Sequence, residues 1–86
     1  MPELSRFYGI IIVMHFDEHH PPHFHARYGS ASIAIEIKTL RVLDGHLPPR
    51  ALGLTVEWAA LHQQELLRAW DLAQSNQHPQ KIPPLP

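Results

Sequence analysis

The sequence predicts a small α+β protein, an antiparallel β-meander of about four strands packed in two layers by one long C-terminal helix. Up to residue 46, short runs rich in β-branched and aromatic residues alternate with glycine and proline turns. After residue 47, apolar residues recur at helical spacing. The 86 residues predict a single α+β domain over 1–76 and a proline-rich extended tail over 77–86.

The first strand is expected over residues 7–16, which are β-branched and aromatic and carry no helix start signal. Alternation puts Ile10, Ile12 and Met14 on one face and Val13 and His15 on the other. Because both faces carry apolar residues and one helix covers a single face, we expect the other face to meet a second subunit or the tail.

The remaining strands follow at turn signals. A proline-stiffened loop over 17–22 leads to a strand over 23–28, and a glycine turn leads to a half-buried strand over 31–38. Residues 40–43 can pair back as a fourth strand. Asp44-Gly45 is expected to end the sheet.

The helix is expected to open at Leu47-Pro48-Pro49, since proline is accepted in a first helical turn. It would run for roughly 26 residues, or about 40 Å, enough to cross the sheet. Trp58 and Trp70 lie on its apolar stripe and are interpreted as core. In the tail, Ile82 and Leu85 can dock on exposed core.

The chemistry is concentrated in the segment from His15 to His25, which holds five of the eight histidines and two carboxylates. With no cysteine in the chain, imidazole and carboxylate would bind a divalent transition metal, with zinc or nickel preferred. On a strand, His23 and His25 point to the same side. The third ligand would come from His19, Asp17, Glu18 or a more distant residue.

Two other interpretations of the cluster stay open. The histidines can be structural groups that hydrogen-bond the proline loop, or they can carry out acid–base chemistry without a metal. If the site is catalytic, Asp17 and Glu18 would handle protons. The isolated residues His15, His46 and His78 are interpreted as incidental.

A candidate ligand also lies on the helix. His62 and Glu65 are three residues apart and share a helical face, so His62 can join His23 and His25 in a metal site. The alternative is a solvent-exposed pair.

Several classes of function lack support. A net charge of -1 supplies no basic field for nucleic acid, and no apolar run is long enough to span a membrane. The N-terminus has no export signal, which predicts a cytoplasmic protein. There is no glycine-rich phosphate loop and no nucleophile elbow.

Motifs along nearly the whole chain carry a family resemblance. They are Ser5-Arg6-Phe7-Tyr8-Gly9-Ile10, Pro21-Pro22-His23-Phe24-His25-Ala26 after His19, Leu47-Pro48 leading into Trp58, Leu61-His62, Glu65-Leu66-Leu67 and Trp70, and the closing Lys81-Ile82-Pro83-Pro84-Leu85. The chain resembles the domain-of-unknown-function 4160 family. The resemblance implies a small bacterial protein, often encoded beside another short reading frame, in pairs suspected to be toxin–antitoxin or regulatory modules. It implies no activity or catalytic residue set, and it disfavours His20 as a ligand because that position is expected to vary.

Three functions remain open. The first is a small interaction module, of toxin–antitoxin type, that forms a homo-oligomer such as a dimer or binds a partner protein from a neighbouring gene. The second is a metal-dependent hydrolase or nuclease that uses the histidine cluster. The third is a metal sensor or carrier without catalysis.

Overall fold

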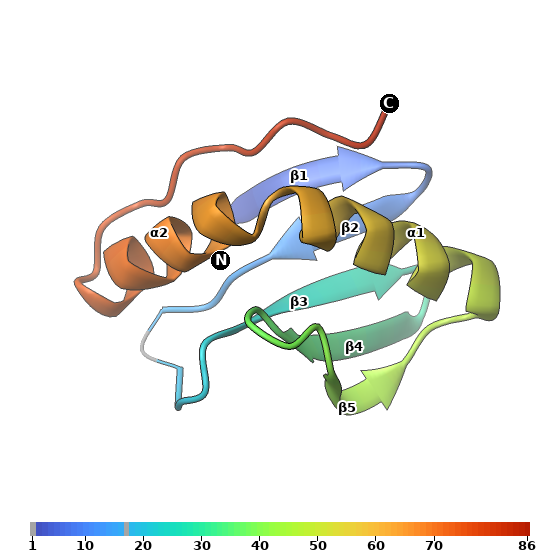
Figure 1. The fold of residues 1–86 in the computed structure, drawn as a ribbon, viewed down its shortest axis with the longest axis horizontal. Helices are drawn as coiled ribbons and strands as arrows, with labels where there is room; N and C mark the ends of the chain where they lie inside the picture. Colours follow the sequence, from blue (N-terminus) through green and yellow to red (C-terminus); the bar gives the residue numbers. More distant parts are fainter. Residues whose placement is uncertain (1, 17) are drawn as a thin grey trace.

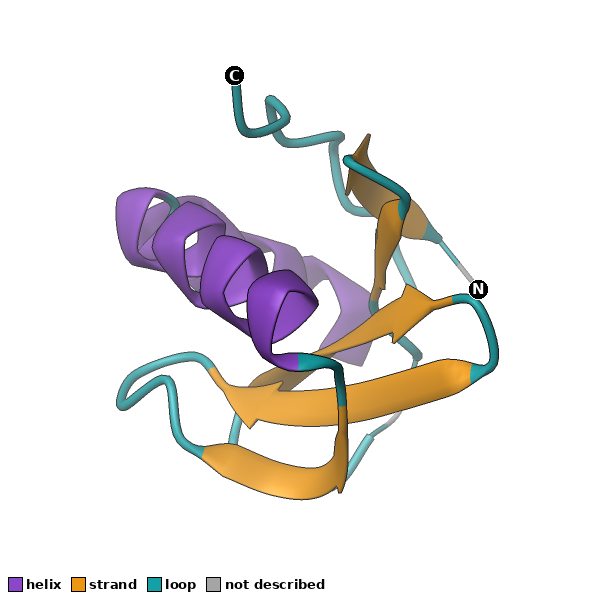
Figure 2. Cartoon of the chain, turned by 90° about the vertical axis from the view of Figure 1, so that its right-hand side faces the viewer, coloured by secondary structure: helices purple, strands orange, loops and turns teal. Residues whose placement is uncertain are grey.

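The computed structural model describes residues 2–16 and 18–86, which form a five-stranded antiparallel sheet with two helices on one of its sides (Figures 1 and 2). The strands follow one another in the order β1-β2-β3-β4-β5, which confirms the predicted α+β meander. The elements are β1 Glu3–Phe7, β2 Ile10–Val13, β3 His23–Tyr28, β4 Ala31–Glu36, β5 Val42–His46, α1 Pro49–Leu61 and α2 Gln63–Gln74.

The expectation of about four strands, with a first strand over 7–16, is wrong. Tyr8 and Gly9 form a turn, with φ of 49° and 80°, so the apolar run is divided between β1 and β2. These two strands pair antiparallel, with Phe7 opposite Ile10. The sequence concealed this turn because Phe7, Tyr8 and Ile10 are good strand formers and only Gly9 suits a positive φ.

The expected end of the sheet at Asp44-Gly45 is also wrong, since both residues lie within β5. Gly45 has φ of 76°, and a Cβ there would lie 2.3 Å from the carbonyl oxygen of Ser32. The glycine therefore allows β5 to approach β4 closely instead of ending the strand.

The single long helix is likewise wrong, because the chain leaves helical geometry at His62, with φ of -127° and ψ of 26°. The break separates α1 from α2. It lets the side-chain amide of Gln63 donate to the carbonyl oxygens of Ile37 at 2.8 Å and Lys38 at 3.1 Å, which ties α2 to the end of β4. Apolar spacing continues across His62, so periodicity alone did not reveal the break.

Trp58 lies at the centre of the core and is fully buried. Its ring contacts those of Phe7 and Phe24, with centroids 5.4 and 6.0 Å apart. Trp70 is also buried, so the interpretation of both tryptophans as core residues is confirmed.

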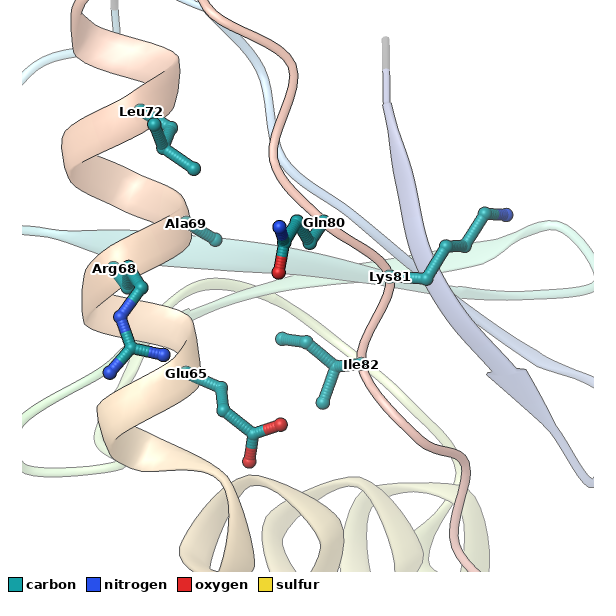
Figure 3. A pocket seen from close by; sticks show the side chains of 7 residues that line it. All are labelled: Glu65, Arg68, Ala69, Leu72, Gln80, Lys81 and Ile82. Carbon is teal, nitrogen blue, oxygen red and sulfur yellow. The ribbon is translucent and has the colours of Figure 1, made fainter.

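The C-terminal tail turns back after α2 and runs beside β1 (Figure 1). The amide of Ile82 donates to the carbonyl oxygen of Leu4 at 2.8 Å, and the indole N–H of Trp58 donates to that of Pro83 at 2.8 Å. Ile82 and Leu85 are buried, as expected for a docked tail. Figure 3 shows Ile82 directed toward α2 across a pocket of about 70 Å³, whereas Lys81 points away. In the described residues, no helix is long and apolar enough to cross a membrane.

Replacing Ile82 with alanine is expected to lower the free energy of unfolding by about 2 kcal/mol, because it removes a buried side chain from the seam between tail and helix. Urea denaturation measures this. The matched control is Lys81→Ala, which removes an exposed side chain and should change the free energy by less than about 0.5 kcal/mol. Equal effects of the two variants would contradict docking through Ile82.

Candidate metal centre

The histidine cluster lies where β2 ends and β3 begins. Val13 of β2 pairs with His25 of β3, so the chain leaving β2 stays beside the start of β3. His15 follows Val13 by two residues. Its side chain therefore points to the same face of the sheet as those of Val13 and His25. The pairing thus brings histidines from two separate segments together.

Three side chains form a group that can hold a metal ion: His15, Glu18 and His25. One ligand atom from each lies within 4.8 Å of the others. The Nε2 atom of His25 is 3.0 Å from Oε1 of Glu18, and the rings of His15 and His25 meet edge to face with centroids 4.4 Å apart. All three are half-buried. The group combines two imidazoles and one carboxylate, a ligand set that suits zinc and other divalent transition metals.

His23 stands beside this group. Its Nδ1 atom lies 2.8 Å from the carbonyl oxygen of Pro21. A carbonyl only accepts, so Nδ1 must carry the proton, and in the neutral ring Nε2 then has a free lone pair. That Nε2 lies 3.8 Å from Oε1 of Glu18. The backbone of the proline loop therefore orients His23 with a metal-binding nitrogen toward the carboxylate.

Residues of helix α2 contact the loop that joins β2 to β3. The side-chain amide of Gln74 donates to the backbone carbonyl oxygen of Glu18 at 3.3 Å. The Trp70 ring contacts His23 and His20, with centroids 5.3 and 5.7 Å apart. These contacts fix the loop relative to the helix, so the position of Glu18 depends on tertiary packing.

The surroundings of His25 and Glu18 favour the form of each that binds a metal. Burial lowers the pKa of the His25 imidazole, and the nearby His15 and His23 lower it further, against the opposing hydrogen bond to Glu18. For Glu18, burial alone would raise the pKa of the carboxyl group, but the hydrogen bond to His25 and the nearby imidazoles hold it below its usual range. At neutral pH, His25 is therefore neutral and Glu18 is ionised, as metal binding requires.

The structure brings together only some of the site residues predicted from the sequence. His23 and His25 lie together with Glu18, which the sequence proposed both as a candidate third ligand and as a group that handles protons. His19 is exposed in the loop and is not part of the three-residue group. Asp17 lies outside the described residues.

His62 belongs to another cluster. Its Nδ1 atom is 2.5 Å from Oε1 of Glu65, and its ring lies 5.4 Å from that of Trp58. The predicted pairing of His62 with Glu65 is therefore present at the helix break. His62 is not part of the group formed by His15, Glu18 and His25.

His15 is the residue that sequence reasoning missed, because it was interpreted as incidental. A signal was available. If residues 13 and 25 pair antiparallel, residue 15 faces residue 23 in the same register, so all three histidines fall on one side. Finding it required the register of a hairpin whose loop is long, and sequence patterns specify such a register weakly.

The fold and this group define a small α+β protein with a histidine–carboxylate cluster at one end of its sheet. Residues 9–71 match the family model described as "Domain of unknown function (DUF4160)". The match covers more than half of the chain, so the protein belongs to this family, in agreement with the resemblance in its motifs. No curated protein and no solved structure matches the chain.

Acid should destabilise the fold in part through His25. The unfolded chain protonates this imidazole near its ordinary pKa of 6.5, whereas the folded chain resists protonation to lower pH. The unfolded state therefore binds more protons as the pH falls through this range, and the free energy of unfolding decreases. The lowered pKa of Glu18 adds a further loss below pH 4.5.

Urea unfolding at about pH 7.5 and about pH 5.5 tests this, since the two values bracket the ordinary histidine pKa. We expect a smaller pH dependence in His25→Gln than in the wild type. His46→Gln, at an exposed position on β5, is the control and should keep the wild-type dependence. A pH dependence in His25→Gln equal to that of the wild type would show that His25 does not contribute.

Proposed function

We propose that the protein binds one divalent transition metal ion through His15, Glu18 and His25, with zinc or nickel as the preferred ion. The observation that carries the proposal is the 4.8 Å limit on the separation of their ligand atoms. Two ligand atoms each about 2.1 Å from an ion are at most about 4.2 Å apart. Small side-chain rotations are therefore enough to bring all three onto one ion.

The contact between His25 and Glu18 supports a preformed site. At 3.0 Å, a proton lies between Nε2 of His25 and Oε1 of Glu18, in the region that an ion would occupy. Nε2 of His25 and Oε1 of Glu18 would hold the ion, and the proton of the neutral His25 ring would then lie on Nδ1. The hydrogen bond thus holds the metal-free protein near the geometry that binding needs.

His23 is proposed as the fourth ligand. Its Nδ1–H donates to the carbonyl oxygen of Pro21, an arrangement that commonly orients metal-binding imidazoles. Its Nε2 lies 3.8 Å from Glu18, and its side chain is only 11% exposed. Four protein ligands complete a tetrahedral shell and leave no position for a reactive water. This favours a non-catalytic metal-binding module, such as a sensor or carrier, over a hydrolase or nuclease.

His19 and His62 are not included among the proposed ligands. His19 is exposed, and the Nδ1 atom of His62 is already paired with Glu65. In a site with four protein ligands, Glu18 is itself a ligand. We therefore propose this role for Glu18 in place of the proton-handling role that a catalytic site would give it.

Elemental analysis of untagged protein purified without chelator is expected to find about one transition metal ion per chain, and titration of zinc into stripped protein should give the same stoichiometry. His25→Ala should weaken zinc binding by at least about 100-fold, because it removes a ligand and leaves Glu18 without its partner. His46→Ala is the matched control and should bind as the wild type does. Absence of metal together with no binding on titration would refute the proposed function.

His23→Ala distinguishes a closed site from an open one. If His23 is the fourth ligand, the variant should still bind one ion per chain but about 10- to 100-fold more weakly, and the visible spectrum of bound Co²⁺ should change. An unchanged cobalt spectrum, with hydrolysis of an activated phosphodiester by the zinc-loaded wild type, would instead indicate three ligands and a reactive water.

A further inference from the structure

A second candidate binding site lies at the opposite end of β3 from His23. It is a pocket of about 190 Å³ beside the start of α1, lined by Tyr8, Tyr28, Pro48, Arg50, Ala51 and Leu54. The turn between β1 and β2 supplies Tyr8, and the end of β3 supplies Tyr28. In Figure 1 these elements meet at the right-hand end of the sheet, the side that faces the viewer in Figure 2.

The two tyrosine rings are held in place although they remain 55% and 40% exposed. The hydroxyl of Tyr8 donates to the carbonyl oxygen of Pro86 at 2.6 Å. Tyr28 lies against Gly9, where an added Cβ would be 3.2 Å from its Cε1 atom. Exposed aromatic rings with fixed positions suit ligand binding because little side-chain freedom is lost when a ligand arrives.

Tyr8 also occupies an unfavourable backbone conformation, with φ of 49°. The first central position of such a tight turn favours asparagine, aspartate or glycine, and a bulky aromatic residue is strained there. The turn alone therefore does not explain a tyrosine. The hydroxyl group of Tyr8 donates the hydrogen bond to Pro86, and its ring lines the pocket.

The charge of the pocket has one sign. Among the described residues that line the pocket, Arg50 is the one that carries a charge, and none has a carboxylate. In the part of the chain that the structure describes, Arg50 forms none of the ion pairs, whereas Arg6 pairs with Glu3 and Arg41 with Glu36. An exposed guanidinium without a carboxylate partner can bind a carboxylate or phosphate with two parallel hydrogen bonds.

From these features we propose that the pocket binds a small ligand with one aromatic ring and one anionic group. A cavity of about 150 Å³ is known to accept a benzene molecule. The volume here therefore suits a single ring that contacts the two tyrosines and the other apolar lining residues, Pro48, Ala51 and Leu54. The anion lies on Arg50. The anionic group can be a phosphate or a carboxylate, and the proposal does not depend on the metal site.

The test is calorimetric titration of the full-length chain with phenyl phosphate and with benzoate. Inorganic phosphate serves as the probe for the anion alone and phenol as the probe for the ring alone. We expect phenyl phosphate or benzoate to bind at least about tenfold more tightly than inorganic phosphate and phenol do. A preference between phenyl phosphate and benzoate identifies the anionic group.

Arg50→Gln should weaken binding of the preferred probe by about tenfold, the effect of losing one charged hydrogen-bonding partner. The matched control is Arg68→Gln, which removes an exposed arginine from α2, outside this pocket, and should bind as the wild type does. Phenyl phosphate and benzoate should also perturb the NMR signals of Tyr8 and Tyr28. No saturable binding of either probe to folded protein, or an equal loss in both arginine variants, would overturn the proposal.

Discussion

The antiparallel pairing of β2 with β3 is the constraint on which the candidate metal centre depends. Val13 opposite His25 determines which side chains share a face, and with them which imidazoles meet. A slip of one residue would turn His23 and His25 into the core and bring Phe24 to the outside, at the cost of burying polar rings and exposing an aromatic one. The hydrophobic pattern of the core therefore also enforces the geometry of the cluster.

Trp58 has a comparable role on the helical side. It packs on Phe7 of β1, Phe24 of β3 and His62 at the helix break, and its indole N–H holds the tail at Pro83. The sheet, the helix break and the tail thus meet at one buried side chain. This explains how 86 residues form a single core with only one layer of helix, because the tail supplies apolar surface that the helices do not.

The histidine cluster concentrates groups that oppose one another when protonated. Burial lowers the pKa of His25, His15 and His23 lower it further, and the carboxylate of Glu18 compensates only in part. A divalent cation bound at the proposed site would be a common partner for the neutral imidazoles and for the carboxylate. The aromatic pocket near Arg50 differs in kind, since it combines rigid rings with a single unpaired cation. The two ends of the sheet therefore present different chemistry.

The sequence by itself determined the fold class, the antiparallel meander, the two core tryptophans, the docking of Ile82 and Leu85, and the family. These follow from local residue preferences and from hydrophobic periodicity, which act over a few neighbouring residues. It also indicated His23, His25 and Glu18 as site residues, since ligand types cluster visibly along the chain.

The tertiary structure decided which of these residues meet. It divided the first apolar run at Tyr8-Gly9, broke the helix at His62, brought His15 into the cluster and left His62 out of it. None of these outcomes follows from the pattern of neighbouring residues in the sequence. Strand register, turn geometry and helix breaks are settled by contacts between segments distant in the chain, such as Gln63 with Ile37 and Val13 with His25, and those contacts exist only once the core has formed.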